Sequence, residues 1–166
     1  MPTATASDGT ALYYEVTGSG PDILFVHEFA GTLKSWETQI RRLSRQYRCI
    51  AFNARGYPPS DIPDDPARYS QDIAIEDAFA VMDAAGSDAA HVVGHSMGGY
   101  TSLHLGLRKP DRVRSLTVAG CGWGSDPDTR EESRALIDDI VRMFEEEGIE
   151  EAARRYADFP MRHRFR

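Results

Sequence analysis

The sequence has little cysteine and no long apolar run, the features that mark disulfide-rich, metal-binding and membrane proteins. Only two residues are cysteine, Cys49 and Cys121, and each stands beside an apolar run. We therefore expect buried free thiols rather than a disulfide or a metal site. No apolar run approaches the length that crosses a membrane, and residues 1–10 lack the basic start and apolar stretch of a secretory signal. A cytoplasmic location without a membrane partner is the expectation.

Positive charge is also scarce. The chain has 26 acidic and 19 basic residues, which gives a formal net charge of −7. Such a chain has no general attraction to phosphate backbones, so nucleic acid is not an expected partner. A length of 166 residues with 41% hydrophobic and 27% charged residues suits one globular domain with a sizeable core.

Short apolar segments alternate with helical patterns along most of the chain. Strand-length segments occupy residues 11–16, 23–26, 49–52, 91–93 and 116–119. The run Ile23-Leu24-Phe25-Val26 is continuously apolar, as in a strand covered on both faces, whereas residues 12–16 alternate as in a half-exposed strand. This rhythm predicts the α/β fold class, a doubly wound and mostly parallel sheet that is entered through a hairpin edge.

Helix boundaries are marked by capping residues. Ser35 is expected to cap one helix, and Ser70 to open another that ends at Gly86. A third helix is expected from Met97 to about residue 108, before a proline. Beyond a glycine-rich loop at 121–127, Thr129 and a glutamate three residues later predict a capping box for a further amphipathic helix.

The most specific functional signal is Gly94-His95-Ser96-Met97-Gly98, which lies between an apolar strand and a helical pattern. A serine hydroxyl needs an activating base, and a tight strand-to-helix turn exposes its oxygen to a substrate. The flanking glycines permit the close backbone approach that this turn requires. The alternative is a glycine-rich turn with an incidental serine.

With two further motifs, the chain resembles the α/β-hydrolase superfamily, in particular small bacterial hydrolases with a helical cap after the sixth strand. Val26-His27-Glu28-Phe29-Ala30-Gly31 resembles the oxyanion loop of that superfamily. Asn53-Ala54-Arg55-Gly56-Tyr57-Pro58-Pro59-Ser60 resembles its Asp-x-Arg-Gly-x-Gly-x-Ser segment. The likeness extends over essentially the whole chain. It implies a core in residues 1–124, truncated after the sixth strand, and the start of the cap in residues 125–166.

The resemblance also implies roles for individual residues. Ser96 would be the nucleophile, and the backbone amides of Phe29 and Met97 would form the oxyanion hole. The elbow and its neighbouring loop would be supported by His27, Gly31, Gly94, His95 and Gly98. Glu28 departs from the glycine common in the family and brings a carboxylate near a developing negative charge. Asn53 replaces the common aspartate.

A catalytic base is not evident. The superfamily places its histidine after the last strand, beyond the residues present here. His91 and His104 are expected to lie too far from Ser96, while His95 is expected to pack and His27 to order the oxyanion loop. His163 belongs to a basic segment near residue 166 and is expected to be solvated. The weak candidates for the acid are Asp126 and Asp128.

We therefore expect a hydrolase of small ester-like or other acyl substrates that acts through an acyl-enzyme, without metal or cofactor, and is incomplete as a catalyst in these 166 residues. An alternative is a non-catalytic module that self-associates through the sheet edge at residues 116–119, which would otherwise lack a partner strand. Lyase, dehalogenase or cofactor-free oxygen chemistry on the same fold is a third option, although serine at the elbow weighs against the usual dehalogenase.

Overall fold

The computed structural model describes residues 2–122 and 124–159. By its internal contacts the chain divides into two compact units, Met1–Cys121 and Gly122–Arg166, and each is described by itself. The division into a catalytic core at 1–124 and a cap at 125–166 stays a prediction, because compactness does not show what the second unit does. His163 lies outside the described residues.

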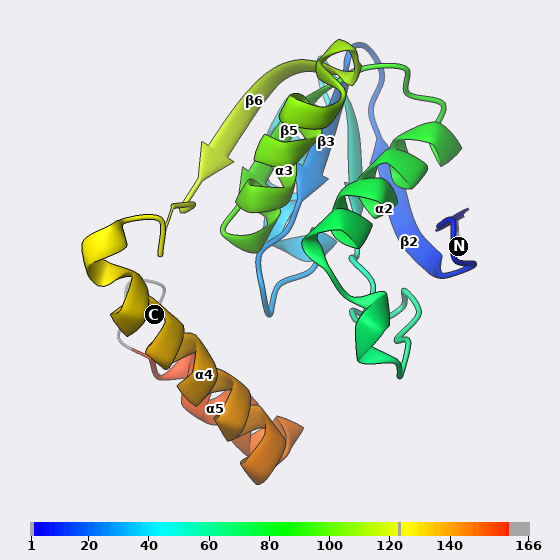
Figure 1. The fold of residues 1–166 in the computed structure, drawn as a ribbon. Coiled ribbons are helices and arrows are strands. Elements are labelled where there is room, and N and C mark those ends of the chain that lie inside the picture. Colours follow the sequence, from blue (N-terminus) through cyan, green and yellow to red (C-terminus); the bar gives the residue numbers. More distant parts are fainter. Residues whose placement is uncertain (1, 123, 160–166) are drawn as a thin grey trace. The chain divides into compact units, whose positions relative to one another are not determined.

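The first unit is built on one six-stranded sheet in the order β1-β2-β4-β3-β5-β6 (Figure 1). The pairs β1–β2 and β2–β4 are antiparallel, whereas the pairs β4–β3, β3–β5 and β5–β6 are parallel. This confirms the predicted mostly parallel sheet with a hairpin edge. The strands are β1 (Thr3–Thr5), β2 (Ala11–Thr17), β3 (Asp22–Val26), β4 (Arg48–Phe52), β5 (Ala90–His95) and β6 (Val113–Ala119).

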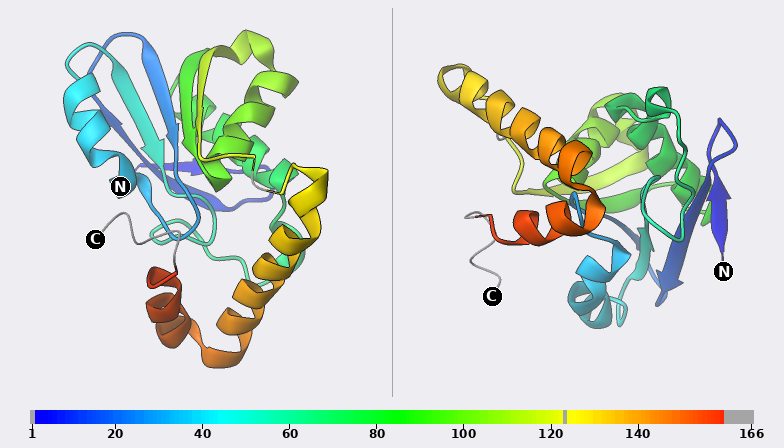
Figure 2. Two further views of the ribbon diagram at one scale, coloured as in Figure 1. Left: turned by 90° about the vertical axis from the view of Figure 1, so that its left-hand side faces the viewer. Right: turned by 90° about the horizontal axis from the view of Figure 1, so that it is seen from below.

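Helices cover both faces of this sheet. Helix α1 (Glu37–Leu43), with the 3-10 turn η1 (Leu33–Trp36) before it, lies on one face. Helices α2 (Gln71–Ala84) and α3 (Met97–Arg108) lie side by side on the other face, as Figures 1 and 2 show. Two further 3-10 turns connect the elements, η2 (Pro66–Arg68) and η3 (Pro110–Arg112).

Strands β3 and β4, in the middle of the sheet, are buried on both faces. In β3, Leu24 and Val26 belong to the core under α2, whereas Ile23 and Phe25 belong to the cluster with Trp36. The ring centroids of Phe25 and Trp36 are 5.3 Å apart. Alternate side chains thus enter two different cores, which confirms that the continuously apolar run is a strand covered on both faces.

The structure confirms one predicted helix cap and corrects two others. The Ser70 hydroxyl accepts a hydrogen bond from the Ile73 amide at 3.2 Å, at the start of α2. Ser35 does not cap a helix, because Thr32 takes that position with an extended backbone and accepts from the Lys34 amide. The capping box at Thr129 is also wrong, since that side chain makes no capping hydrogen bond.

Strand β6 forms an open edge of the sheet. Among the described residues it pairs with β5 alone, and all its side chains after Val113 are exposed. They include Leu116, 37% exposed, and Val118, 40% exposed. Unpaired strand amides with apolar neighbours form a surface that other chains can add to.

The second unit is a helical hairpin. Asp126 caps the 3-10 turn η4 (Pro127–Thr129) by accepting from the Asp128 amide at 3.0 Å. Helices α4 (Arg130–Glu147) and α5 (Ile149–Ala157) follow and pack on each other, with a break at Gly148. Gly148 has φ of 77°, a conformation that glycine adopts without strain. None of the described helices is long and apolar enough to cross a membrane.

Candidate active site at the carboxyl end of strand β5

Ser96 occupies a sharp turn between β5, which ends at His95, and α3, which begins at Met97. Its φ is 52° and its ψ is −117°, an unfavourable backbone conformation for a residue with a side chain. Surrounding hydrogen bonds hold this conformation: the Ser96 amide donates to the Ala119 carbonyl at 2.8 Å, and the Gly99 amide donates to the Ser96 carbonyl at 2.8 Å. The structure therefore contains the strained strand–turn–helix geometry of a nucleophile elbow.

The neighbouring glycines are sterically required. A Cβ atom on Gly98 would lie 2.6 Å from the His27 carbonyl oxygen, and closer still to that of Val26. A Cβ atom on Gly94 would lie 2.6 Å from the Gly98 carbonyl carbon. Real Cβ atoms essentially never approach other heavy atoms this closely. The spacing of small residues around Ser96 is thus imposed by the contact of the elbow with β3 and with its own helix.

Ser96 is half-buried and precedes a helix of twelve residues. It is the N-terminal cap residue of α3, but its side chain makes no capping hydrogen bond. The hydroxyl is therefore not bonded to the free amides at the start of the helix. The first amide of the helix belongs to Met97, the predicted oxyanion donor, and the positive end of the helix dipole lies here.

The segment after β3 carries Phe29, the second predicted oxyanion donor, whose residue is 40% exposed. The segment turns tightly: the Gly31 amide donates to the Glu28 carbonyl at 3.1 Å, and Ala30 has φ of 57°. The loop after β4 holds this turn, because the Tyr57 hydroxyl accepts from the Ala30 amide at 3.2 Å. Residues 28–31 are hereafter called the oxyanion loop.

Asn53 adds a second connection between the two loops. Its side-chain oxygen accepts from the Leu33 amide at 2.9 Å, and its side-chain nitrogen donates to the Pro58 carbonyl at 2.6 Å. Asn53 is 3% exposed, and its contact with Leu33 is buried while its contact with Pro58 is partly buried. An aspartate could make the first contact but not the second, which gives the asparagine at this position a physical reason.

His27 is placed to order the loops and not to serve Ser96. It is 1% exposed, its Nδ1 lies 2.8 Å from the Glu28 carbonyl oxygen, and its Nε2 accepts from the Ala54 amide at 3.0 Å. These partners fix a neutral ring with the proton on Nδ1. Burial lowers the pKa of His27 below its ordinary value, so the ring stays neutral. Both nitrogens are occupied, which removes His27 as a base.

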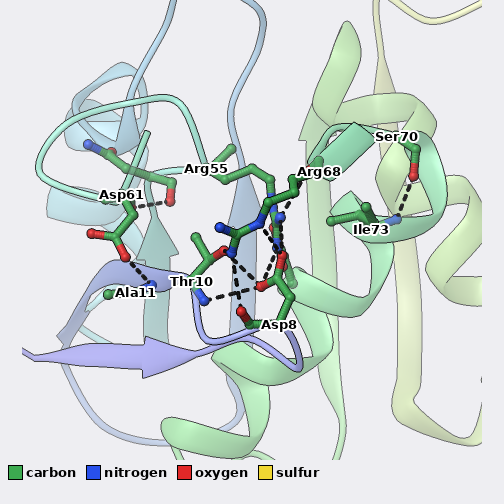
Figure 3. A network of polar contacts seen from close by, with 12 residues as sticks. Asp8, Thr10, Ala11, Arg55, Asp61, Arg68, Ser70 and Ile73 are labelled. Carbon is green, nitrogen blue, oxygen red and sulfur yellow. Dashed lines mark hydrogen bonds and ion pairs between the residues drawn. The ribbon is translucent and has the colours of Figure 1, made fainter. Parts of the chain in front are cut away.

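A network of ionised side chains holds the loop after β4 (Figure 3). Arg55 donates to both carboxylate oxygens of Asp77 on α2 at 2.7 Å, and to Asp8 at 2.8 Å. Arg68 also donates to Asp8, at 3.1 Å. Hydrogen bonds from Arg55 and Arg68 hold the pKa of Asp8 well below its usual range. The network joins the β1–β2 turn, the loop after β4 and α2.

The pair between Arg55 and Asp77 is buried, with exposed fractions of 6% and 3%. The Asp77 carboxylate raises the pKa of Arg55. Burial raises the pKa of Asp77 while hydrogen bonds from Arg55 lower it. The bidentate hydrogen bonding of Arg55 to both carboxylate oxygens of Asp77 is typical of an ionised pair. The sequence motif singled out Arg55, but Asp8 and Asp77 were missed; a charged residue on the buried face of a helix was the available signal for Asp77.

His95 and Glu28 lie beside each other at the elbow. The Nδ1 atom of His95 is 3.8 Å from the Oε2 atom of Glu28, and the Ser35 hydroxyl donates to the Oε1 atom of Glu28 at 2.9 Å. The His95 side chain is 42% exposed, so it is not a packed core residue. The two side chains thus form a polar contact between the elbow and the oxyanion loop.

The remaining described histidines are engaged elsewhere. His91 stands at the start of the parallel strand β5 and contacts the Ser115 hydroxyl at 2.8 Å. His104 lies two turns into α3. Asp126 is used as a cap, as described above. Within residues 2–122 and 124–159, the structure therefore places no histidine as an evident base for Ser96, and no group of three or more potential metal-ligating side chains.

Comparisons with known proteins agree with this geometry. The family model described as "alpha/beta hydrolase fold" matches residues 21–160. A protein of Azorhizobium caulinodans named as the carbamate hydrolase RutD is 37% identical over 123 residues, which are 74% of this chain and 45% of that protein. Epoxide hydrolase 2 of Siraitia grosvenorii is 31% identical over 156 residues, 90% of this chain and 49% of its own length. The chain thus spans about half the length of these relatives.

Among solved structures, a hydrolase from Pseudomonas aeruginosa PA01 superimposes with a TM-score of 0.77 at 26% identity. The match covers 98% of this chain and 64% of that one. The strand order, the strained turn at Ser96 and the family match over most of the chain lead to one assignment. The chain belongs to the α/β-hydrolase fold family.

Proposed function

We propose that this chain carries the nucleophile and the oxyanion hole of a hydrolase that acts on ester-like or other acyl substrates. Ser96 is the nucleophile, and the amides of Phe29 and Met97 bind the oxyanion. The observation that carries the proposal is the conformation of Ser96, a strained residue at the start of α3 whose hydroxyl is not used as a cap. Strain of this kind persists where the surrounding structure enforces it for function.

The chemistry of serine favours acyl substrates over the epoxides named for one of the relatives. Attack of the Ser96 oxygen on an epoxide carbon would form an ether, which water does not cleave under mild conditions. Attack on an acyl carbon forms an ester, which water can hydrolyse to regenerate the hydroxyl. Serine at this position therefore permits turnover with acyl groups, including the carbamoyl group of a carbamate, but not with an epoxide.

The proposed reaction has two halves. The Ser96 oxygen bonds to the acyl carbon and loses its proton to a base, the bond from that carbon to the leaving group breaks, and the proton passes to the leaving group. Water then bonds to the acyl carbon, one of its protons passes through the base to the Ser96 oxygen as the bond from that oxygen to the acyl carbon breaks, and the acid is released. Each oxyanion donor contributes about 3 kcal/mol to the tetrahedral intermediate. We infer that the base belongs to a part of the protein outside the described residues.

Covalent labelling tests the nucleophile directly. The chain is incubated for hours at about pH 9 with p-nitrophenyl acetate, so that hydroxide in solution can remove the Ser96 proton in place of the missing base, and peptide mass spectrometry locates the acetyl group. We expect acetylation of Ser96, loss of this adduct in Ser96→Ala, and no change in Ser115→Ala, which alters a serine on the far part of β6. Acetylation confined to other residues would refute the proposal.

Turnover tests the missing base. Without it, we expect the 166-residue chain to release p-nitrophenol at a steady rate close to that of Ser96→Ala, even where Ser96 is acetylated. Sustained turnover that depends on Ser96 would show that a residue of this chain activates the hydroxyl. If that turnover persists in His163→Gln, a described residue is the base and that part of the proposal is overturned.

The exposed edge of β6 favours a second candidate function, a non-catalytic module that self-associates. Two copies paired through β6 would cover Leu116 and Val118 and satisfy the unpaired amides. Light scattering after size-exclusion chromatography should then report a dimer that Thr117→Pro converts to a monomer. A wild-type monomer at high concentration would exclude this candidate.

A further inference from the structure

The Glu28 carboxylate is held in a defined position at the edge of the oxyanion loop. Its Oε1 atom accepts from the Ser35 hydroxyl at 2.9 Å, and its side chain is 23% exposed. A Cβ atom on Gly31 would lie 2.5 Å from the Cδ atom and 2.9 Å from the Oε2 atom of Glu28. The carboxylate therefore occupies the space that a side chain at position 31 would fill, and Gly31 fixes where the charge sits.

This charge has little compensation. Among the described residues, the one basic side chain within 4.0 Å of the carboxylate is His95, at 3.8 Å, and its imidazole is charged only when protonated. Neither lysine nor arginine in the described part of the chain comes within that distance of Glu28. A mostly buried carboxylate without a fixed cation projects its negative potential onto its surroundings more strongly than a solvated one.

The carboxylate lies near the proposed reaction centre. His95, which contacts it, is the residue before Ser96, and adjacent Cα atoms are about 3.8 Å apart. Glu28 is also the residue before Phe29 on the oxyanion loop. These steps place the carboxylate no more than ~14 Å from the Ser96 oxygen, and partly buried charges are screened by salt much less than solvated ones.

We propose that Glu28 is a specificity-determining residue that selects against acyl substrates carrying a negative charge near the reacting carbonyl group. This inference rests on the proposed function, since it requires acyl transfer to Ser96. The carboxylate opposes the oxyanion of every substrate equally, so that effect cancels between substrates. Only the interaction with a charge on the substrate itself changes their ratio. Neutral and cationic acyl groups are accepted, and anionic acyl groups are disfavoured by about fivefold.

The test compares two esters of nearly equal length and the same leaving group. The rate constant for acylation of Ser96 is measured at about pH 9, where hydroxide replaces the missing base, with neutral p-nitrophenyl pentanoate and with anionic mono-p-nitrophenyl glutarate. Glu28→Gln keeps the size of the side chain and an oxygen for the Ser35 hydroxyl while removing the charge. We expect the ratio of the anionic to the neutral rate constant to rise about fivefold in Glu28→Gln at low salt, and the difference from wild type to shrink in 1 M salt, as screening requires.

Asp111→Asn serves as the matched control, because it removes one exposed negative charge from η3. It should leave the ratio unchanged. A purely structural role of Glu28 would alter both rate constants by the same factor. The ratio would then stay unchanged in Glu28→Gln, and this result would overturn the inference. Acylation of Ser96 by the neutral ester reports the proposed function separately: if that ester fails in the wild-type chain, both proposals fall, whereas an unchanged ratio with active acylation removes only the role of Glu28.

Discussion

Removal of the charge of Asp77 should destabilise the fold strongly. Asp77→Asn preserves the volume of the side chain but takes away the charge that faces Arg55, which is only 6% exposed. Loss of one partner from a buried ion pair typically costs 3–5 kcal/mol, because the remaining charge is left without compensation. Arg55 keeps its contact with Asp8, a carboxylate whose side chain is 32% exposed. We therefore expect the lower end of that range, a loss of about 3 kcal/mol in the free energy of unfolding.

The assay is urea denaturation followed by circular dichroism, with the slope on urea concentration compared between variants to confirm that the same transition is measured. Asp83→Asn is the matched control, since Asp83 lies on the same helix and pairs with Arg112 at the surface, with its own side chain 64% exposed. Its loss should cost less than about 1 kcal/mol. Equal effects of the two substitutions would refute the argument that burial sets the energy of the Arg55–Asp77 pair.

Three further changes test the loops around Ser96. His27 should make the free energy of unfolding depend on pH, because its pKa is lowered in the folded chain while in the unfolded chain it binds a proton near pH 6.5. The free energy of unfolding should therefore fall as the pH drops below about 6.5. Thermal melts from pH 8 to 5 should show this slope, reduced in His27→Gln. Gly98→Ala should lower stability by about 3 kcal/mol or displace the elbow, because its methyl group meets the backbone of β3; wild-type melting together with wild-type acetylation of Ser96 would contradict this. Asn53→Asp should cost about 2 kcal/mol in urea denaturation, since a carboxylate would face the Pro58 carbonyl, whereas Asn53→Asp as stable as wild type would show that this hydrogen bond contributes little.

Much of the first unit could be predicted from the sequence because its signals are local. The apolar run of β3 predicts a strand with two covered faces. Ser70 predicts the start of α2, because its capping contact involves an amide only three residues later. The Gly-x-Ser-x-Gly spacing likewise predicts a turn whose geometry is found at Ser96. Each of these features is decided by residues that are neighbours in sequence.

Other features depend on contacts that no local pattern contains. The Ser35 cap was mispredicted because Thr32 is equally suited to cap and the chain turns three residues earlier; the Ser35 hydroxyl instead contacts Glu28. Strand β1 is too short to show an alternating pattern, and its pairing with β2 defines it. The contact of Arg55 with Asp8 joins positions 47 residues apart. Long-range polar partners of this kind become visible only when the sheet brings their loops together.

The hydrogen bond from the Ser96 amide to the Ala119 carbonyl has a mechanical consequence. Ala119 is the last residue of β6, the strand at the open edge of the sheet, and a Cβ atom on the following Gly120 would touch the ring of His95. The proposed nucleophile is therefore anchored to an edge strand of the sheet, which another chain can reach. Any strand that docks on this edge and shifts β6 would transmit its displacement to Ser96 through a single peptide group, so occupancy of the edge and reactivity of the serine should be measured together.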